Sequence, residues 1–110
     1  MSVDPSANQH LYPYLTSLDD KVIAACPGRT ASVIADAIRG ALGLPRAEVT
    51  DLTAAESIVH LIAEQFVIDV HGVSDDQFAM LKDHYNEPEI VAMLFRMALT
   101  DGLGKLEKVA

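Results

Sequence analysis

The chain has 110 residues, of which half are apolar and 22% are charged, a composition typical of one globular domain and not of a disordered segment. Its 16 acidic and 8 basic residues give a net charge of −8, so we expect neither nucleic acid nor an anionic membrane as a partner. No apolar run approaches the ~18 residues that cross a bilayer, and the first residues lack the pattern of a signal peptide. A single cysteine, Cys26, cannot form an internal disulfide, and we expect a cytoplasmic protein.

Residues 1–16 are predicted to form an N-terminal arm ahead of a single helical domain over residues 17–110. Pro5 and Pro13 each disfavour helix in the residue that precedes them, and polar residues fill much of the space between. Residues 11–15 are nevertheless rich in leucine and tyrosine. The arm is therefore expected to lie across the domain or against a neighbouring subunit.

Two helices are predicted in the first half of the chain. The first spans residues 17–26, because Pro27 and Gly28 end it. The second spans residues 30–42, and Gly43 is expected to cap its C-terminus. The apolar residues of the second helix form one continuous stripe, made of Val33, Ile34, Ala37, Ile38, Ala41 and Leu42.

Three more helices are predicted after residue 52, because three capping boxes follow one another. In a capping box a short oxygen-bearing side chain accepts from the backbone three residues on, and a Glu or Gln there reaches back. The boxes are Thr53 with Glu56, Ser74 with Gln77, and Asn86 with Glu89. They predict helices over about 53–70, 74–85 and 86–109.

The helix over residues 53–70 is the most apolar, so it is placed at the centre of the fold. In the last helix Gly102 and Gly104 interrupt the apolar pattern, and each either allows another helix to approach or marks a bend. No strand pattern and no internal repeat is present. The sequence predicts an all-α, five-helix bundle.

The second half of the chain resembles the carboxymuconolactone decarboxylase and alkyl hydroperoxidase D-like family. The resemblance covers about residues 50–109. It is based on Glu64-Gln-Phe-Val-Ile-Asp-Val-His-Gly-Val-Ser-Asp75, followed by Phe78, Leu81, His84-Tyr85 and Glu89-Ile-Val91. It implies a five-helix bundle of the alkyl hydroperoxidase D-like type, a homo-oligomer, and a small acid or lactone as ligand.

The peroxidase branch of that family has a Cys-x-x-Cys pair, in which one thiolate attacks a peroxide and the second thiol resolves the intermediate. Here Cys26 is followed three residues later by Arg29, and no second thiol exists. Dithiol peroxidase activity is therefore not expected. The decarboxylase branch does not need the pair, so at most a decarboxylase or lactone-type reaction is implied.

His60, Glu64 and His71 fall on one side of the helix over residues 53–70, at i, i+4 and i+11. A histidine beside a carboxylate is a general-base arrangement, and the three together could also hold a divalent metal. The alternative is that they form the polar side of the helix, facing solvent or a subunit boundary. The three residues are the candidate catalytic group, and no metal or cofactor is assigned.

Cys26 is a candidate redox residue, because Arg29 nearby could favour its thiolate; the alternative is a small buried apolar residue. Three functions follow from these observations. The first is a family scaffold that binds a small acid or lactone, with weak or no catalysis. The second is a non-catalytic structural or interaction homo-oligomer, and the third is a one-cysteine redox protein using Cys26.

Overall fold

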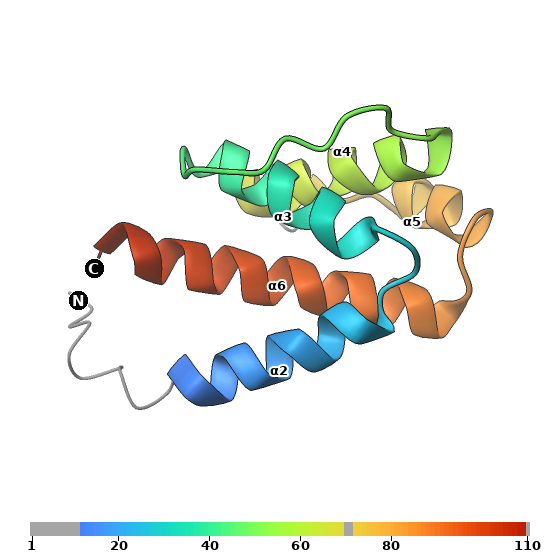
Figure 1. The fold of residues 1–110 in the computed structure, drawn as a ribbon. Helices are drawn as coiled ribbons and strands as arrows, with labels where there is room; N and C mark the ends of the chain where they lie inside the picture. The colour runs from blue at the N-terminus through green and yellow to red at the C-terminus, as the bar shows by residue number, and fades with distance from the viewer. Residues whose placement is uncertain (1–11, 70–71, 110) are drawn as a thin grey trace.

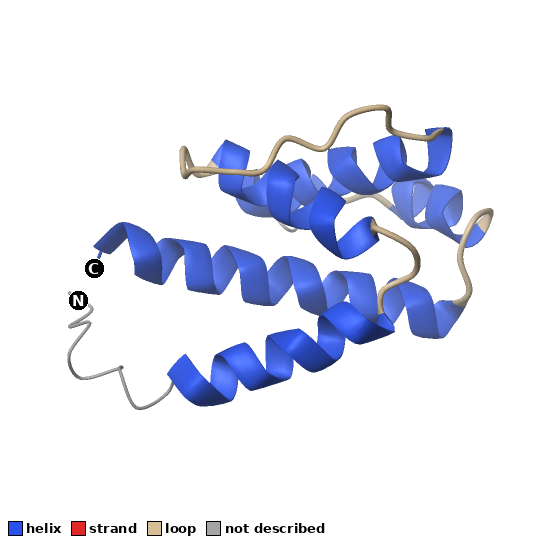
Figure 2. Ribbon diagram, in the orientation of Figure 1, coloured by secondary structure: helices blue, strands red, loops and turns tan. Residues whose placement is uncertain are grey.

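The computed structural model describes residues 12–69 and 72–109, and over these residues it contains five α-helices and no strand (Figures 1 and 2). The helices are α2 (Tyr12–Ala25), α3 (Thr30–Ala41), α4 (Ala54–Ile68), α5 (Asp75–Lys82) and α6 (Glu87–Val109). The predicted all-α bundle is confirmed for this part of the chain. None of these helices is long and apolar enough to cross a membrane.

All three predicted capping boxes form. The backbone N–H of Thr53 donates to Glu56 Oε1 at 2.9 Å, and the N–H of Glu56 donates to Thr53 Oγ1 at 3.1 Å. The same reciprocal bonds join Ser74 with Gln77 at 2.9 and 3.2 Å. They also join Asn86 with Glu89 at 3.0 and 2.9 Å. The starts of α4, α5 and α6 therefore follow from local hydrogen bonding.

The first helix begins earlier than predicted, at Tyr12 and not at Ser17. Pro13 lies in the first turn of α2, where its missing N–H leaves no hydrogen bond unmade, so it begins the helix instead of preventing it. The hydroxyl of Thr16 donates to the Pro13 carbonyl at 3.3 Å within this turn. Residues 12–16 are thus helical, and residues 1–11 of the predicted arm lie outside the described part.

The end of α3 was predicted correctly. Gly43 adopts a φ of 73°, in the left-handed region that glycine tolerates. Its N–H donates to the Gly40 carbonyl at 3.1 Å, and the N–H of Leu44 donates to the Arg39 carbonyl at 2.8 Å. These two bonds form a Schellman motif, which turns the chain sharply after α3.

The centre of the fold is α3, and the prediction that the helix over residues 53–70 lies there is wrong. α3 packs on α4 on one side and on α6 on the other, and α6 in turn packs on α2 (Figure 1). The apolar residues of α4 are spread around the helix, so one face packs on α3 while Leu61 and Ile68 remain exposed. The largest fully buried side chains are Ile34, Ile38, Ile62, Leu81, Met93, Met97, Val33 and Val59.

α6 is one continuous helix through both of its glycines. At Gly104 a Cβ atom would lie 2.8 Å from Leu42 Cδ1 and 3.3 Å from Leu44 Cδ1, so this glycine allows the turn after α3 to approach the helix. At Gly102 no atom of the residues described by the structure lies within 4 Å of that position. Packing among the described residues therefore explains Gly104 but not Gly102.

Candidate functional site

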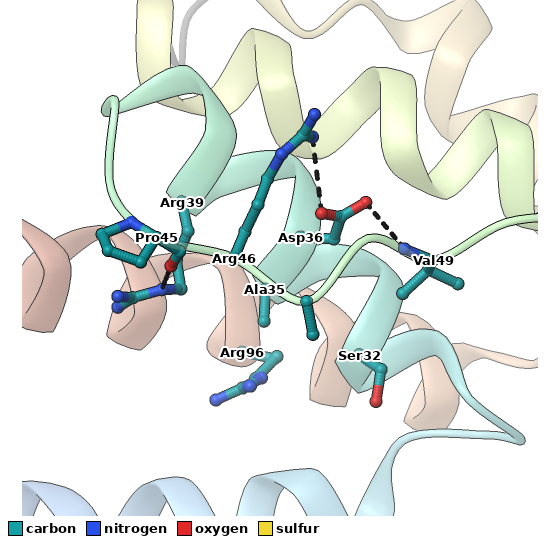
Figure 3. A pocket seen from close by; sticks show the side chains of 9 residues that line it. Ser32, Ala35, Asp36, Arg39, Pro45, Arg46, Val49 and Arg96 are labelled. Carbon is teal, nitrogen blue, oxygen red and sulfur yellow. Dashed lines mark hydrogen bonds and ion pairs between the residues drawn. The ribbon is translucent and has the colours of Figure 1, made fainter.

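The segment that follows α3 folds back along this helix and is held there by Asp36. This carboxylate is buried in α3, with 5% of the residue exposed. Its Oδ2 accepts from the backbone N–H of Val49 at 3.3 Å, and its Oδ1 lies 3.4 Å from Nη1 of Arg46 (Figure 3). Asp36 therefore fixes the path of this segment, whose residues line two cavities.

The first cavity has a volume of about 520 Å³ and is lined by three of the four arginines of the chain, Arg39, Arg46 and Arg96. The rest of its lining consists of the short side chains of Ala35, Pro45, Ala47 and Val49, together with the hydroxyl of Ser32 and the carboxylate of Asp36. In Figure 3 the side chains of Arg39 and Arg96 extend to the same side of the segment, toward α2, whereas Arg46 extends to the opposite side. Two guanidinium groups thus share one space.

Both of these guanidinium groups are held in place. Arg39 donates from Nε to the Pro45 carbonyl at 2.6 Å and from Nη1 to Glu107 Oε2 at 2.7 Å. Arg96 donates from Nη1 to Asp19 Oδ2 at 2.6 Å and from Nε to the Ala31 carbonyl at 3.3 Å. The hydrogen bond with Glu107 raises the pKa of Arg39 and lowers that of Glu107.

Nη2 of Arg39 also donates to Glu107 Oε1 at 3.2 Å, so every nitrogen of Arg39 has a partner and only one N–H is left unused on each of its two Nη atoms. An arginine has five N–H donors, and the described residues provide no partner for Nη2 of Arg96. Arg96 is nevertheless largely buried, with 12% of its side chain exposed. The two N–H groups of this Nη2 are held in place and largely shielded from water, so they are suited to bind an oxygen atom of a ligand.

The second cavity, of about 450 Å³, contains two of the three predicted catalytic residues, His60 and Glu64. Nδ1 of His60 lies 2.7 Å from Glu64 Oε1, and its Nε2 lies 3.9 Å from Asp36 Oδ2. Arg46 lines this cavity as well as the first, so the two spaces adjoin. His71 lies outside the described residues.

The structure adds Asp36 and the three arginines to the residues predicted from the sequence. Asp36 had only a weak signal, since it is a charged residue beside the apolar stripe of the helix over residues 30–42. The arginines had none, because they come from α3, from the segment after it, and from α6. Within residues 12–69 and 72–109, no group of three or more His, Cys, Asp or Glu side chains is placed to hold a metal ion.

Cys26 is a buried residue at the end of α2, with 8% exposed. Its pKa is raised, because burial disfavours the thiolate more than nearby Arg96 and Thr30 favour it. Arg29, the expected activator, instead bonds to Glu56 through Nε at 2.6 Å and Nη2 at 2.9 Å. The structure therefore favours the alternative in which Cys26 is a small buried apolar residue.

Arg29 has a structural role at the start of α4. Besides its two bonds with Glu56, it donates to the carbonyls of Thr50 and Asp51 at 3.1 and 2.8 Å. Together with the capping bonds, the hydrogen bond from Arg29 lowers the pKa of Glu56 to about 2. This network connects the start of α3 to the start of α4.

Comparisons of the chain with models of protein families, with curated proteins and with solved structures gave no match. The function of the protein is therefore inferred from the geometry of its own cavities.

Proposed function

We propose that the protein is a carboxymuconolactone decarboxylase-like helical scaffold that binds a small carboxylic acid or lactone in the cavity between Arg39 and Arg96. The observation behind the proposal is that these two guanidinium groups line one cavity (Figure 3) and that Nη2 of the largely buried Arg96 has no partner among the described residues. In the family that the second half of the chain resembles, a short helix and a final long helix follow a long one, and α4, α5 and α6 have the same order of lengths.

The chemistry of the cavity fits an oxygen anion attached to a short hydrocarbon body. Guanidinium groups bind carboxylates through paired N–H donors, and this pairing is strongest where water is partly excluded. The carbonyl of a lactone accepts the same hydrogen bonds without the charge. Ala35, Pro45, Ala47 and Val49 provide apolar contact for the carbon chain.

The arrangement favours binding over turnover. Apart from Asp36, whose oxygens face Val49 and Arg46, no side chain lining the first cavity is a general base. His60, whose Nε2 lies 3.9 Å from Asp36 Oδ2, lines the second cavity, where its Nδ1 lies 2.7 Å from Glu64 Oε1. Any proton transfer by this pair would act on a ligand that extends past Arg46.

Calorimetric titration tests the proposal with three probes of similar size: glutarate, δ-valerolactone and the neutral diamide glutaramide. Glutarate is expected to bind most tightly, the lactone weakly and the diamide least. Replacing Arg39 by methionine should weaken glutarate binding at least about 10-fold, since one charge-assisted hydrogen-bonded pair is lost.

The matched control is Lys82→Met, which removes one positive charge from α5, outside the residues that line the cavity. Circular dichroism shows that each variant is folded. Equal binding of glutarate and glutaramide, or an equal loss in Arg39→Met and Lys82→Met, would contradict the proposal.

A further inference from the structure

One face of α6 is exposed in a regular pattern. Between residues 90 and 106 every position of α6 is buried or half-buried except 91, 95, 98, 102 and 105. Their spacing alternates between four and three residues, and the next residue of the series, at position 109, is also exposed. These are the a and d positions of a heptad repeat, the pattern of a helix that packs along another helix. We call this line the α6 seam; it consists of Val91, Phe95, Ala98, Gly102, Lys105 and Val109.

The seam is apolar and hollowed at its N-terminal half. Val91 and Phe95 are 49% and 56% exposed. Together with Ala98, and with Leu94 and Phe66 beside it, they line a cavity of about 280 Å³ whose lining is entirely apolar. A large aromatic side chain exposed over such a hollow stabilises an interface when a partner covers it.

Gly102 adds an independent observation. A glycine in the middle of a helix weakens that helix relative to alanine, and here no atom of the described chain approaches the position. Gly104, two residues later, is explained by Leu42 and Leu44, whereas the described residues give Gly102 no such reason. The missing side chain leaves room on the outer surface, at the centre of the seam.

The charges on the seam are compatible with a second copy of this chain as the partner. Two molecules with a net charge of −8 repel each other over most of their surfaces. The seam has no carboxylate, and its single charge is Lys105, which is paired with Asp101 at 2.9 Å. Two copies can therefore meet along this line without bringing carboxylates of the seam together.

The seam is also complementary to itself. It is symmetric about residue 100, so an antiparallel copy places Val91 against Val109 and the small residues Ala98 and Gly102 against each other. The same register places Phe95 against Lys105, whose aliphatic stem and ammonium group both pack well on an aromatic ring. In a dimer with two-fold symmetry both copies use the same surface patch, as they do in this register.

We infer that two copies of the chain form a dimer by packing their α6 seams antiparallel, with Phe95 of each copy on Lys105 of the other. This inference is independent of ligand binding in the arginine cavity, since none of the seam residues lines that cavity.

Sedimentation equilibrium of the full chain, from micromolar to several hundred micromolar, tests the inference. The wild type is expected to dimerise, and Phe95→Glu should raise the dimer dissociation constant at least about 30-fold, as loss of a central aromatic contact does. The matched control is Met80→Glu, which places the same charge on α5 at a residue that is 43% exposed. A wild type that stays monomeric, or a dimer equally weakened by both variants, overturns the inference.

Cross-linking tests the direction of the helices. Chains carrying Val91→Cys or Val109→Cys are mixed and oxidised; the native thiol of Cys26 is buried. Antiparallel seams give a disulfide between the two different variants, whereas parallel seams join Val91→Cys to itself. Self-linked Val91→Cys as the main product would refute the antiparallel arrangement.

Discussion

Gly102 and Gly104 lie two residues apart in α6, and replacing each with alanine is expected to have different effects on stability. At Gly102 the new Cβ atom would have no atom of residues 12–69 or 72–109 within 4 Å. The substitution therefore acts through two properties of alanine alone: it favours helix more than glycine does, and it leaves the unfolded chain with less conformational freedom. A gain of about 1 kcal/mol in the free energy of unfolding is expected.

At Gly104 the same gain is opposed by overlap. The new Cβ atom would lie 2.8 Å from Leu42 Cδ1, closer than two carbons can pack, and 3.3 Å from Leu44 Cδ1. Overpacking costs roughly 1–3 kcal/mol, and the contacting atoms are the ends of leucine side chains that can shift. The net change is therefore expected between zero and a loss of about 2 kcal/mol.

Urea unfolding followed by circular dichroism measures both variants against the wild type. Each titration is repeated at tenfold lower protein concentration, because a midpoint that does not depend on concentration reports the single chain and not a dimer. The two variants should differ by at least about 1 kcal/mol, or roughly 4 °C in melting temperature. If Gly104→Ala stabilises the chain as much as Gly102→Ala, the turn after α3 does not pack on α6 as described.

Three further predictions concern α4 and the thiol. Thr53→Ala should lower the free energy of unfolding by about 1 kcal/mol, whereas Ser17→Ala, at an exposed position within α2, should change it little; equal effects would argue against the cap. The pKa of Glu56 is about 2 in the folded chain, against an ordinary value of 4.5. Its contribution to the free energy of unfolding is therefore complete above pH 4.5 and is lost as the pH falls toward 2. Glu56→Gln should therefore flatten the dependence of the unfolding midpoint on pH in that window, and an unchanged slope would contradict the assignment. Cys26 should react with a thiol reagent at pH 8 much more slowly in the folded chain than in urea, and equal rates would show that it is accessible.

The helix boundaries that the sequence predicted well are those governed by neighbouring residues. The three capping boxes and the cap at Gly43 each involve groups within a few positions of one another, so short-range chemistry is sufficient to fix them. The start of α2 was not predicted, although it too depends on neighbouring residues. Pro13 is compatible both with an extended arm and with the first turn of a helix, and the sequence does not distinguish them.

The candidate site was only partly predictable. The pairing of His60 with Glu64 follows from their spacing of four residues on one helix. The meeting of Arg39 with Arg96 does not, because these residues are brought together by the packing of α3 on α6. Arg29 illustrates the same limit, since its nearness to Cys26 in sequence suggested an interaction, whereas its guanidinium bonds to Glu56.

The sequence by itself determined that the chain forms helices, where most of them begin, and that no second thiol can support a dithiol reaction. Those properties depend on composition and on contacts between near neighbours. Tertiary structure decided that α3 and not α4 is central, that Asp36 holds the segment after α3, and that two arginines share one cavity. These outcomes depend on which helical faces pack together, and that choice is made by side chains far apart in the chain.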